Sequence, residues 1–145
     1  MDIFWLIPQK IAGGSHPKDP SDIKILLSHN ISHVISLIEN PSNIRKLIEK
    51  TDIELNSIPI IDYGTPSQSQ IQEYLSIISH NLSNNQAVFV HCLGGCGRTG
   101  TMLAIYLVSS GYDSLEAIEM VRALRPCSIE TKEQEKVVLD FKSDN

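Results

Sequence analysis

The chain has 145 residues, of which 41% are hydrophobic and 20% are charged. This length fits one domain and the hydrophobic fraction can fill a core, so we expect a single folded domain over residues 1–145 rather than a disordered chain. The net charge is −5, from 12 Lys and Arg against 17 Asp and Glu. Such a chain lacks the basic surface needed for broad binding to nucleic acid or to an anionic membrane.

The apolar runs predict neither a membrane span nor a secretory signal. Runs such as Met102–Val108 are far shorter than the ~20 residues that cross a bilayer. Met1–Pro8 contains Asp2 and has no basic flank, which makes it a poor signal peptide. The three cysteines are unevenly spaced and do not suggest a disulfide framework. We therefore expect a cytoplasmic protein in a reducing compartment.

Short apolar runs rich in branched side chains predict strands. Four such runs occur in the first two thirds of the chain: Ile3–Ile7, His33–Ile38, Ile58–Ile61 and Ala87–Val90. The last of them has no polar alternation, which is typical of a central strand that is covered on both faces. Ala87–Val90 is therefore the predicted centre of the sheet.

Helix signals alternate with these runs and then continue alone to the C-terminus. Residues that typically begin a helix precede most of the predicted helices: Asp19 with Pro20, Pro41, Ser67 with Gln70, Asp113 and Thr131. Thr101–Ser109 is almost entirely apolar, which predicts a buried central helix. The alternation predicts an α/β domain whose central, mostly parallel sheet of about four to five strands has helices on both faces.

A glycine-rich segment connects the central strand to the buried helix. Residues 91–100 read His-Cys-Leu-Gly-Gly-Cys-Gly-Arg-Thr-Gly. Between a strand and a helix N-terminus, such a turn points backbone N–H groups at one place and favours an anion such as phosphate. Open α/β sheets bind ligands at this end of their strands. The predicted phosphate-binding residues are Leu93, Gly94, Gly95, Cys96, Gly97 and Arg98.

Three side chains give this loop a chemistry. Cys92 is the first loop residue, and the inward N–H groups and helix terminus should stabilise its thiolate, which makes it an in-line nucleophile towards bound phosphate. The planar guanidinium of Arg98 can grip two equatorial oxygens and follow the charge into the transition state. The hydroxyl of Thr99 can stabilise the thiolate when the sulfur leaves.

The Cys-x5-Arg-Thr stretch of residues 92–99 resembles the signature of the cysteine-dependent protein tyrosine and dual-specificity phosphatases. The resemblance extends over most of the chain. Lys10–Ser15 looks like the early strand and turn of small dual-specificity phosphatases, Ile58–Pro66 like their general-acid loop, and Val121–Pro126 like the end of their penultimate helix. The group that the chain is most similar to is that of the compact archaeal protein tyrosine phosphatases.

The resemblance implies a two-step reaction through a cysteinyl-phosphate, with no metal or other cofactor. It assigns the general acid and base to Asp62 and the support of the nucleophile to His91. From the residues alone, Asp62 could also belong to an ordinary turn, where Asp is common. The sequence itself offers no convincing metal cluster.

Gln134 has two interpretations. It is the third residue of a capping box that begins at Thr131, and the resemblance aligns it with the family glutamine that orients the hydrolytic water. Four residues earlier the family usually has a second glutamine, where this chain has Glu130. A carboxylate at that position would repel phosphate unless it is shielded or turned away.

Other polar residues near the motif have weaker assignments. Cys96 could line the mouth of the pocket and form a reversible disulfide with Cys92, whereas Cys127 is expected to be a passive thiol. Glu39 could lie at the edge of the site or simply end a strand. We expect the histidines outside the motif to be solvated: His16, His29, His33 and His80.

The function implied is a monomeric phosphomonoester hydrolase that acts on phosphoproteins. The chain is short and has no evident phosphotyrosine-recognition segment, so phosphoserine and phosphothreonine are expected substrates beside phosphotyrosine. Tyr63, next to the proposed acid, could favour an aryl phosphate. One alternative on the same scaffold is an RNA 5′-triphosphatase or phosphoinositide phosphatase, although the loop lacks their basic residues. The other is a phosphate-binding module without turnover.

Overall fold

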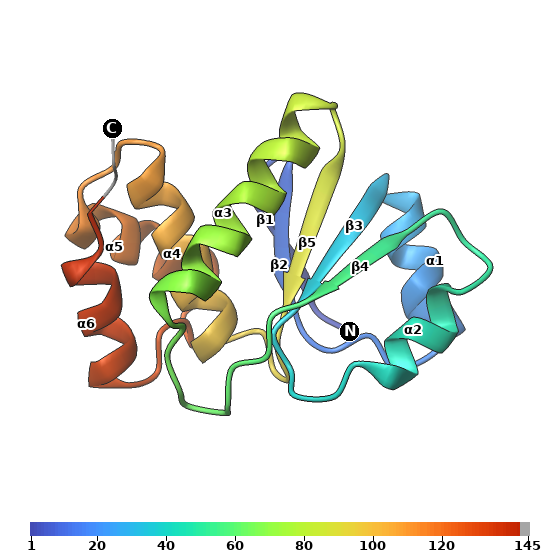
Figure 1. Cartoon of the computed structure of the whole chain (residues 1–145), viewed down its shortest axis with the longest axis horizontal. Coiled ribbons are helices and arrows are strands. Elements are labelled where there is room, and N and C mark those ends of the chain that lie inside the picture. The colour runs from blue at the N-terminus through green and yellow to red at the C-terminus, as the bar shows by residue number, and fades with distance from the viewer. Residues whose placement is uncertain (143–145) are drawn as a thin grey trace.

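A five-stranded sheet with the strand order β1-β2-β5-β3-β4 forms the centre of the computed structural model, which describes residues 1–142 (Figure 1). The strands are β1 (Ile3–Ile7), β2 (Ile11–Gly14), β3 (Ile31–Ser36), β4 (Glu54–Ser57) and β5 (Ala87–His91). Only the edge pair of β1 and β2 is antiparallel among these strands. The predicted α/β class, with a mostly parallel sheet and the run at 87–90 in its middle, is confirmed.

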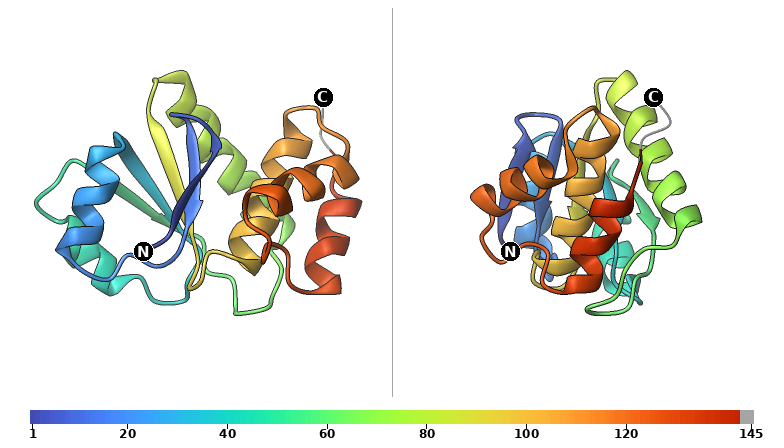
Figure 2. Two further views of the ribbon diagram at one scale, coloured as in Figure 1. Left: turned by 180° about the vertical axis from the view of Figure 1, so that it is seen from behind. Right: turned by 90° about the vertical axis from the view of Figure 1, so that its left-hand side faces the viewer.

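Six helices among the described residues cover the two faces of the sheet: α1 (Pro20–Ser28), α2 (Ser42–Ile48), α3 (Gln68–Ser83), α4 (Gly97–Ser109), α5 (Ser114–Leu124) and α6 (Lys132–Asp140). Buried residues of α1 and α2 pack with Phe89 and Val34 on one face, and those of α3 to α6 pack with Val88 and Val90 on the other. Figure 2 shows α1 and α2 on the opposite side of the sheet from α4, α5 and α6.

The predicted helix caps are present. The Asp19 side chain accepts a hydrogen bond from the Asp22 N–H, and Pro20 begins α1. Ser67 and Gln70 form a reciprocal capping box at the start of α3, and Thr131 and Gln134 form another at α6. These caps satisfy backbone N–H groups that the helices leave without internal partners.

Two predicted boundaries are wrong. Residues 58–61 are not a strand, because β4 comes just before them and Pro59 has no N–H to continue the ladder. Ile58 and Ile60 still donate backbone hydrogen bonds to Ser36 and Leu37, so this segment stays beside the end of β3. Helix α4 begins at Gly97 rather than Thr101, since the glycine-rich loop turns directly into the first helical turn.

The parallel strands bring their carboxyl ends to one edge of the sheet. Gly14, Ser36 and His91 end β2, β3 and β5, and His91 is paired with both of the other two. Open α/β sheets bind ligands at the carboxyl ends of their strands, so this is the expected place for a site. None of the helices described has the length and apolar character required to cross a membrane.

Two adjacent leucines of α1 test which face of this helix packs against the core. Leu26 is fully buried and Leu27 is 44% exposed. Leu26→Ala should lower the free energy of unfolding by about 2–5 kcal/mol, because a cavity remains in the core. Leu27→Ala should change it by about 0.5 kcal/mol or less. Urea denaturation of the two variants measures the difference, and equal losses would show that the face of α1 is assigned wrongly.

Candidate active site

The phosphate-binding loop predicted at residues 92–98 joins β5 to α4 at the carboxyl edge of the sheet. Neighbouring segments fix it from both sides: the Leu37 N–H donates to the His91 carbonyl at 2.9 Å, and the His16 N–H donates to the Leu93 carbonyl at 3.0 Å. Gly95 has a φ of +75°, and a Cβ there would lie 2.6 Å from the carbonyl carbon of Gly14. The loop therefore needs glycine at this position in order to curl against the end of β2.

Cys92 lies at the base of the loop. Its side chain is buried, with an exposed fraction of 3%, and it is the one free cysteine among the described residues. Thr99 is also fully buried, and its hydroxyl forms no hydrogen bond within the described part of the chain. The role of this hydroxyl towards the Cys92 sulfur stays a prediction, because no contact joins the two side chains.

Arg98 is a buried cation that joins three segments. Its Nη1 donates to the Ile60 carbonyl at 2.8 Å and to Glu39 Oε1 at 3.2 Å. Its Nη2 lies 3.5 Å from Asp62 Oδ1. A buried charge requires such partners, and five N–H groups leave donors free for a ligand. Glu39 therefore belongs to the site, which resolves the choice that the sequence left open.

Asp62 lies on the rim, with 55% of its side chain exposed. Its Oδ1 accepts the Tyr63 N–H at 3.0 Å, so the residue forms a local turn and also faces the loop. One cavity of about 190 Å³ is lined by Asp62, Tyr63, Cys92, Leu93, Gly94, Cys96, Arg98 and Glu130. The structure thus brings the predicted nucleophile, arginine and acid together. A second cavity of about 320 Å³ shares Asp62, Leu93 and Arg98 and extends to His16 and Glu39.

Glu130 and Gln134, near the start of α6, contact the loop and the segment after Asp62, respectively. The fully buried Gln134 accepts backbone N–H bonds from Glu130 and Thr131 and donates through Nε2 to the Gly64 carbonyl at 3.1 Å. It therefore caps α6 and also ties the Asp62 segment to this helix. Glu130 Oε1 accepts the Gly97 N–H at 2.9 Å. The Glu130 carboxylate, which the sequence predicts to lie near phosphate, is thus held by the backbone amide of Gly97.

His91 supports the loop from inside the core. Its Nδ1 donates to the Cys92 carbonyl at 2.8 Å, so this nitrogen carries the proton of the neutral ring. Burial lowers the pKa of His91 to about 4, which leaves the imidazole uncharged near neutral pH. The His91 ring also lies 5.6 Å from that of His16, measured between centroids.

The expectation of solvated histidines is wrong at two positions. His16 has a buried Nδ1, and its pKa is lowered, first by desolvation and then by the charge of Lys18. Its place two residues after β2, at the ligand-binding edge, is a signal that sequence analysis could have used. His33 is buried in β3 and bonds to the side chain of Asn56 on β4.

The cysteine predictions are also wrong. Cys96 forms a disulfide with Cys127, with the two Cα atoms 5.1 Å apart. Cys127 is therefore not a passive thiol, and Cys96 is not paired with Cys92. The bond closes 31 residues of chain, which the chain-entropy model values at about 3–4 kcal/mol of stability. No sequence pattern could reveal this pair, because only the tertiary fold brings the α5–α6 connection to the loop.

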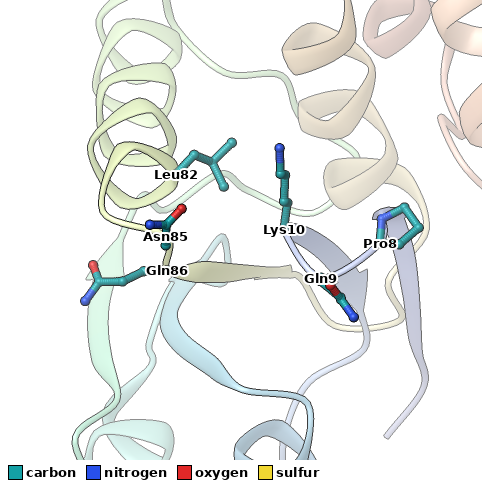
Figure 3. Close-up of a pocket in the computed structure, with 6 residues that line it drawn as sticks. All are labelled: Pro8, Gln9, Lys10, Leu82, Asn85 and Gln86. Atoms are coloured by element: carbon teal, nitrogen blue, oxygen red, sulfur yellow. The ribbon is translucent and has the colours of Figure 1, made fainter.

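A separate cavity lies at the opposite edge of the sheet. It has a volume of about 270 Å³, and Figure 3 shows its lining: Pro8, Gln9, Lys10, Leu82, Asn85 and Gln86. These residues come from the β1–β2 turn, the last turn of α3 and the segment between α3 and β5, so the cavity is remote from the glycine-rich loop. Across residues 1–142, no group of three or more His, Cys, Asp and Glu side chains is arranged to hold a metal ion.

Comparison with known proteins identifies the family and the fold. The sequence model of the family described as "Swiss Army Knife protein, DSP-PTPase phosphatase domain" matches residues 2–138. An uncharacterized protein of Methanocaldococcus jannaschii is 40% identical over 58% of this chain and 56% of its own. The dual specificity protein phosphatase CDC14B of Mus musculus is 27% identical over 95% of this chain and 30% of its own.

The crystal structure of Tk-PTP in its active form has the same fold. It superposes with a TM-score of 0.84 and 29% identity, covering 94% of this chain and 92% of that chain. The present chain spans little more than half the length of the two Methanocaldococcus jannaschii relatives and under a third of CDC14B. Residues 2–138, which the family model matches, contain the loop, Asp62 and Arg98.

A glycine pair tests the shape of the loop. Gly95→Ala should lower the free energy of unfolding by about 1–3 kcal/mol and weaken the binding of inorganic phosphate, because the added Cβ meets the Gly14 backbone at a positive φ. Gly94→Ala is the matched control, since the nearest atom to its added Cβ is the Cys96 sulfur at 4.0 Å. Calorimetric titration measures the phosphate affinity of both variants, and urea denaturation measures their free energies of unfolding. Equal losses in the two variants would contradict this loop geometry.

The depressed pKa of His91 predicts a pH-dependent stability. The unfolded chain binds a proton near pH 6.5 and the folded chain only near pH 4. The contribution of neutral His91 is therefore complete above pH 6.5 and is lost as the pH falls towards 4, by about 3 kcal/mol in total. His91→Asn, which cannot titrate there, should show a correspondingly smaller loss in urea denaturation between pH 7 and pH 4. Parallel profiles for the two proteins would refute the assignment.

Proposed function

The chain belongs to the DSP-PTPase family of phosphatases, and we propose that it hydrolyses phosphotyrosine in proteins through a cysteinyl-phosphate intermediate. The observation that carries the proposal is the shared cavity of about 190 Å³, in which Cys92, Arg98 and Asp62 meet the backbone of the glycine-rich loop. A nucleophile, a cation and an acid around one anion site are the groups that phosphoryl transfer requires.

In the first step, the Cys92 sulfur attacks phosphorus and forms the S–P bond. The bond from phosphorus to the leaving oxygen breaks, and Asp62 donates its proton to that oxygen. In the second step, water attacks phosphorus and the S–P bond breaks. The Asp62 carboxylate takes the proton from water, and the electron pair of the S–P bond returns to sulfur as the thiolate.

Arg98 is already positioned for both steps. The Ile60 carbonyl and Glu39 hold its Nη1 in place. Its remaining N–H donors can therefore bind equatorial oxygens of the phosphate while the guanidinium keeps its orientation. Because the guanidinium also lies 3.5 Å from Asp62, bound phosphate and the acid meet on the same side of the loop. This pre-organisation stabilises charge that develops in the transition state.

We assign supporting roles to three further residues. Thr99 donates its hydroxyl to the departing thiolate, and His91 holds the Cys92 carbonyl so that the loop amides point inwards. Gln134 sets the distance between the Asp62 segment and α6 through its bond to Gly64, and orients the hydrolytic water on the side of the loop that faces α6.

The rim of the cavity favours an aryl phosphate on a protein. Tyr63 and Leu93 line the cavity and are 61% and 57% exposed, so they can pack against a phosphotyrosine ring. The cavity is small, so the shorter phosphoserine and phosphothreonine side chains can also use it. They are poorer substrates because they have no ring to pack against Tyr63 and Leu93. Polyphosphates, RNA ends and phosphoinositides are disfavoured, because the same rim carries the acidic side chains of Asp62, Glu39 and Glu130.

The proposed setting is the cytoplasm, with a monomer acting on phosphoproteins and with no nucleic-acid, membrane or metal partner. A disulfide in such a compartment is usually transient or regulatory, apart from those of hyperthermophiles. The Cys96–Cys127 bond is therefore expected to form under oxidising conditions rather than to be a permanent link.

Kinetics of three variants test the proposed roles. Cys92→Ser should show no detectable hydrolysis of a phosphotyrosine peptide. Asp62→Asn should lower kcat by about 10²–10⁴-fold, because the leaving oxygen loses its proton donor. Asp52→Asn, an equivalent change at an exposed aspartate away from the loop, should keep the wild-type rate.

Additives and a second substrate test the same proposal. Full activity should remain in EDTA, vanadate should inhibit, and a matched phosphothreonine peptide should be hydrolysed more slowly than the phosphotyrosine peptide. Wild-type turnover by Cys92→Ser would exclude the mechanism. Faster hydrolysis of an RNA 5′-triphosphate than of the peptide would exclude the substrate class.

A further inference from the structure

The connection between α5 and α6 holds the phosphate-binding loop at several points. Arg125 Nη2 donates to the Gly94 carbonyl at 2.7 Å, and Glu130 Oε1 accepts the Gly97 N–H at 2.9 Å. The Cys96–Cys127 disulfide lies between these two contacts in the sequence and adds a covalent link. Residues 125–130 therefore act as a brace along the loop, and one part of this brace can be opened chemically.

We propose that the Cys96–Cys127 bond is a reversible redox switch that sets how tightly the loop binds oxyanions. The oxidised form binds phosphate tightly, and exchange with a small or protein dithiol converts it to a form that binds phosphate weakly. The inference rests on the proposed function in that it describes regulation of the same site. It differs from oxidation of the nucleophile, because Cys92 remains a free thiol in both forms.

The two sulfurs differ in access in the way that such a switch needs. Cys127 is exposed and follows Pro126 outside any helix, whereas Cys92 is buried. Cys96 is half-buried and occupies the N-cap position of the 13-residue helix α4. The greater exposure of Cys127 favours attack by a dithiol at that residue, and the helix N-terminus stabilises Cys96 as the leaving thiolate.

The exchange balances without any group beyond the dithiol. One thiolate of the dithiol attacks the Cys127 sulfur, the Cys96–Cys127 bond breaks, and its electron pair leaves on Cys96. The second thiol of the reagent then attacks the mixed disulfide, releases Cys127 as a thiolate and leaves the reagent as a disulfide. The protein gains two electrons, and the two protons of the dithiol become available to the new thiols.

Opening the bond changes the loop in two ways that act in the same direction. The covalent link between the loop and residues 125–130 is lost, so the Cys96 side chain is no longer tied to Cys127 and the loop is held by hydrogen bonds alone. The released Cys96 sulfur lines the same cavity as Asp62 and Glu130, so a thiolate there adds negative charge beside the bound anion. Both effects weaken the binding of phosphate.

The test measures inorganic phosphate binding by calorimetric titration, before and after treatment with dithiothreitol. Alkylation and mass spectrometry verify the state of each cysteine. Oxidised wild type should bind phosphate on the order of tenfold more tightly than the reduced protein. Cys127→Ser, which keeps the Cys96 thiol but cannot close the bond, should bind as weakly as reduced wild type with or without dithiothreitol.

Two matched measurements complete the design. The double variant Cys96→Ser, Cys127→Ser, with neither link nor thiol at these positions, should not respond to dithiothreitol. Equal affinities of oxidised and fully reduced wild type would overturn the switch, as would a failure of Cys96 and Cys127 to pair in oxidised glutathione. If the affinity shifts while no phosphotyrosine peptide is hydrolysed in either state, the switch stands and the proposed function fails.

Discussion

The buried guanidinium of Arg98 is the interaction on which the site depends. Backbone hydrogen bonds place the loop after β5, the segment after β3 and residues 58–60 side by side. Arg98 links the side chains of these segments through the Ile60 carbonyl, Glu39 and Asp62. Its charge is tolerable in the core only because these oxygens surround it. The same desolvation makes the charge effective towards a bound anion.

The C-terminal half of the chain acts as a support for this site. Helices α4, α5 and α6 pack on one face of the sheet, and the residues between α5 and α6 reach the loop through Arg125, Cys127 and Glu130. Gln134 extends the same support to the Asp62 segment. Contacts from one layer of helices thus hold both the proposed acid and the proposed nucleophile, although the two residues follow different strands of the sheet.

The sequence predicted the parts of this site that depend on local order. The α/β fold, the loop at 92–98 and the caps at Ser67 and Thr131 follow from spacing and from turn chemistry, whereas the choice of Asp62 follows from the resemblance to the phosphatase family. The parts that it missed are tertiary. The partial burial of His16, the Arg125 brace and the Cys96–Cys127 bond depend on how β2 and the α5–α6 connection pack beside the loop. The strand predicted at 58–61 failed because an apolar run does not show that Pro59 ends the ladder.

The central claim is that Cys92, held in this loop, attacks phosphorus and carries the phosphoryl group. The most direct measurement is mass spectrometry of the Asp62→Asn variant after acid quenching of its reaction with a phosphotyrosine peptide. The account predicts one phosphoryl group on the peptide that contains Cys92, and none in a parallel sample of Cys92→Ser. Product release without any modified Cys92 peptide, or a phosphoryl group on another residue, would contradict it.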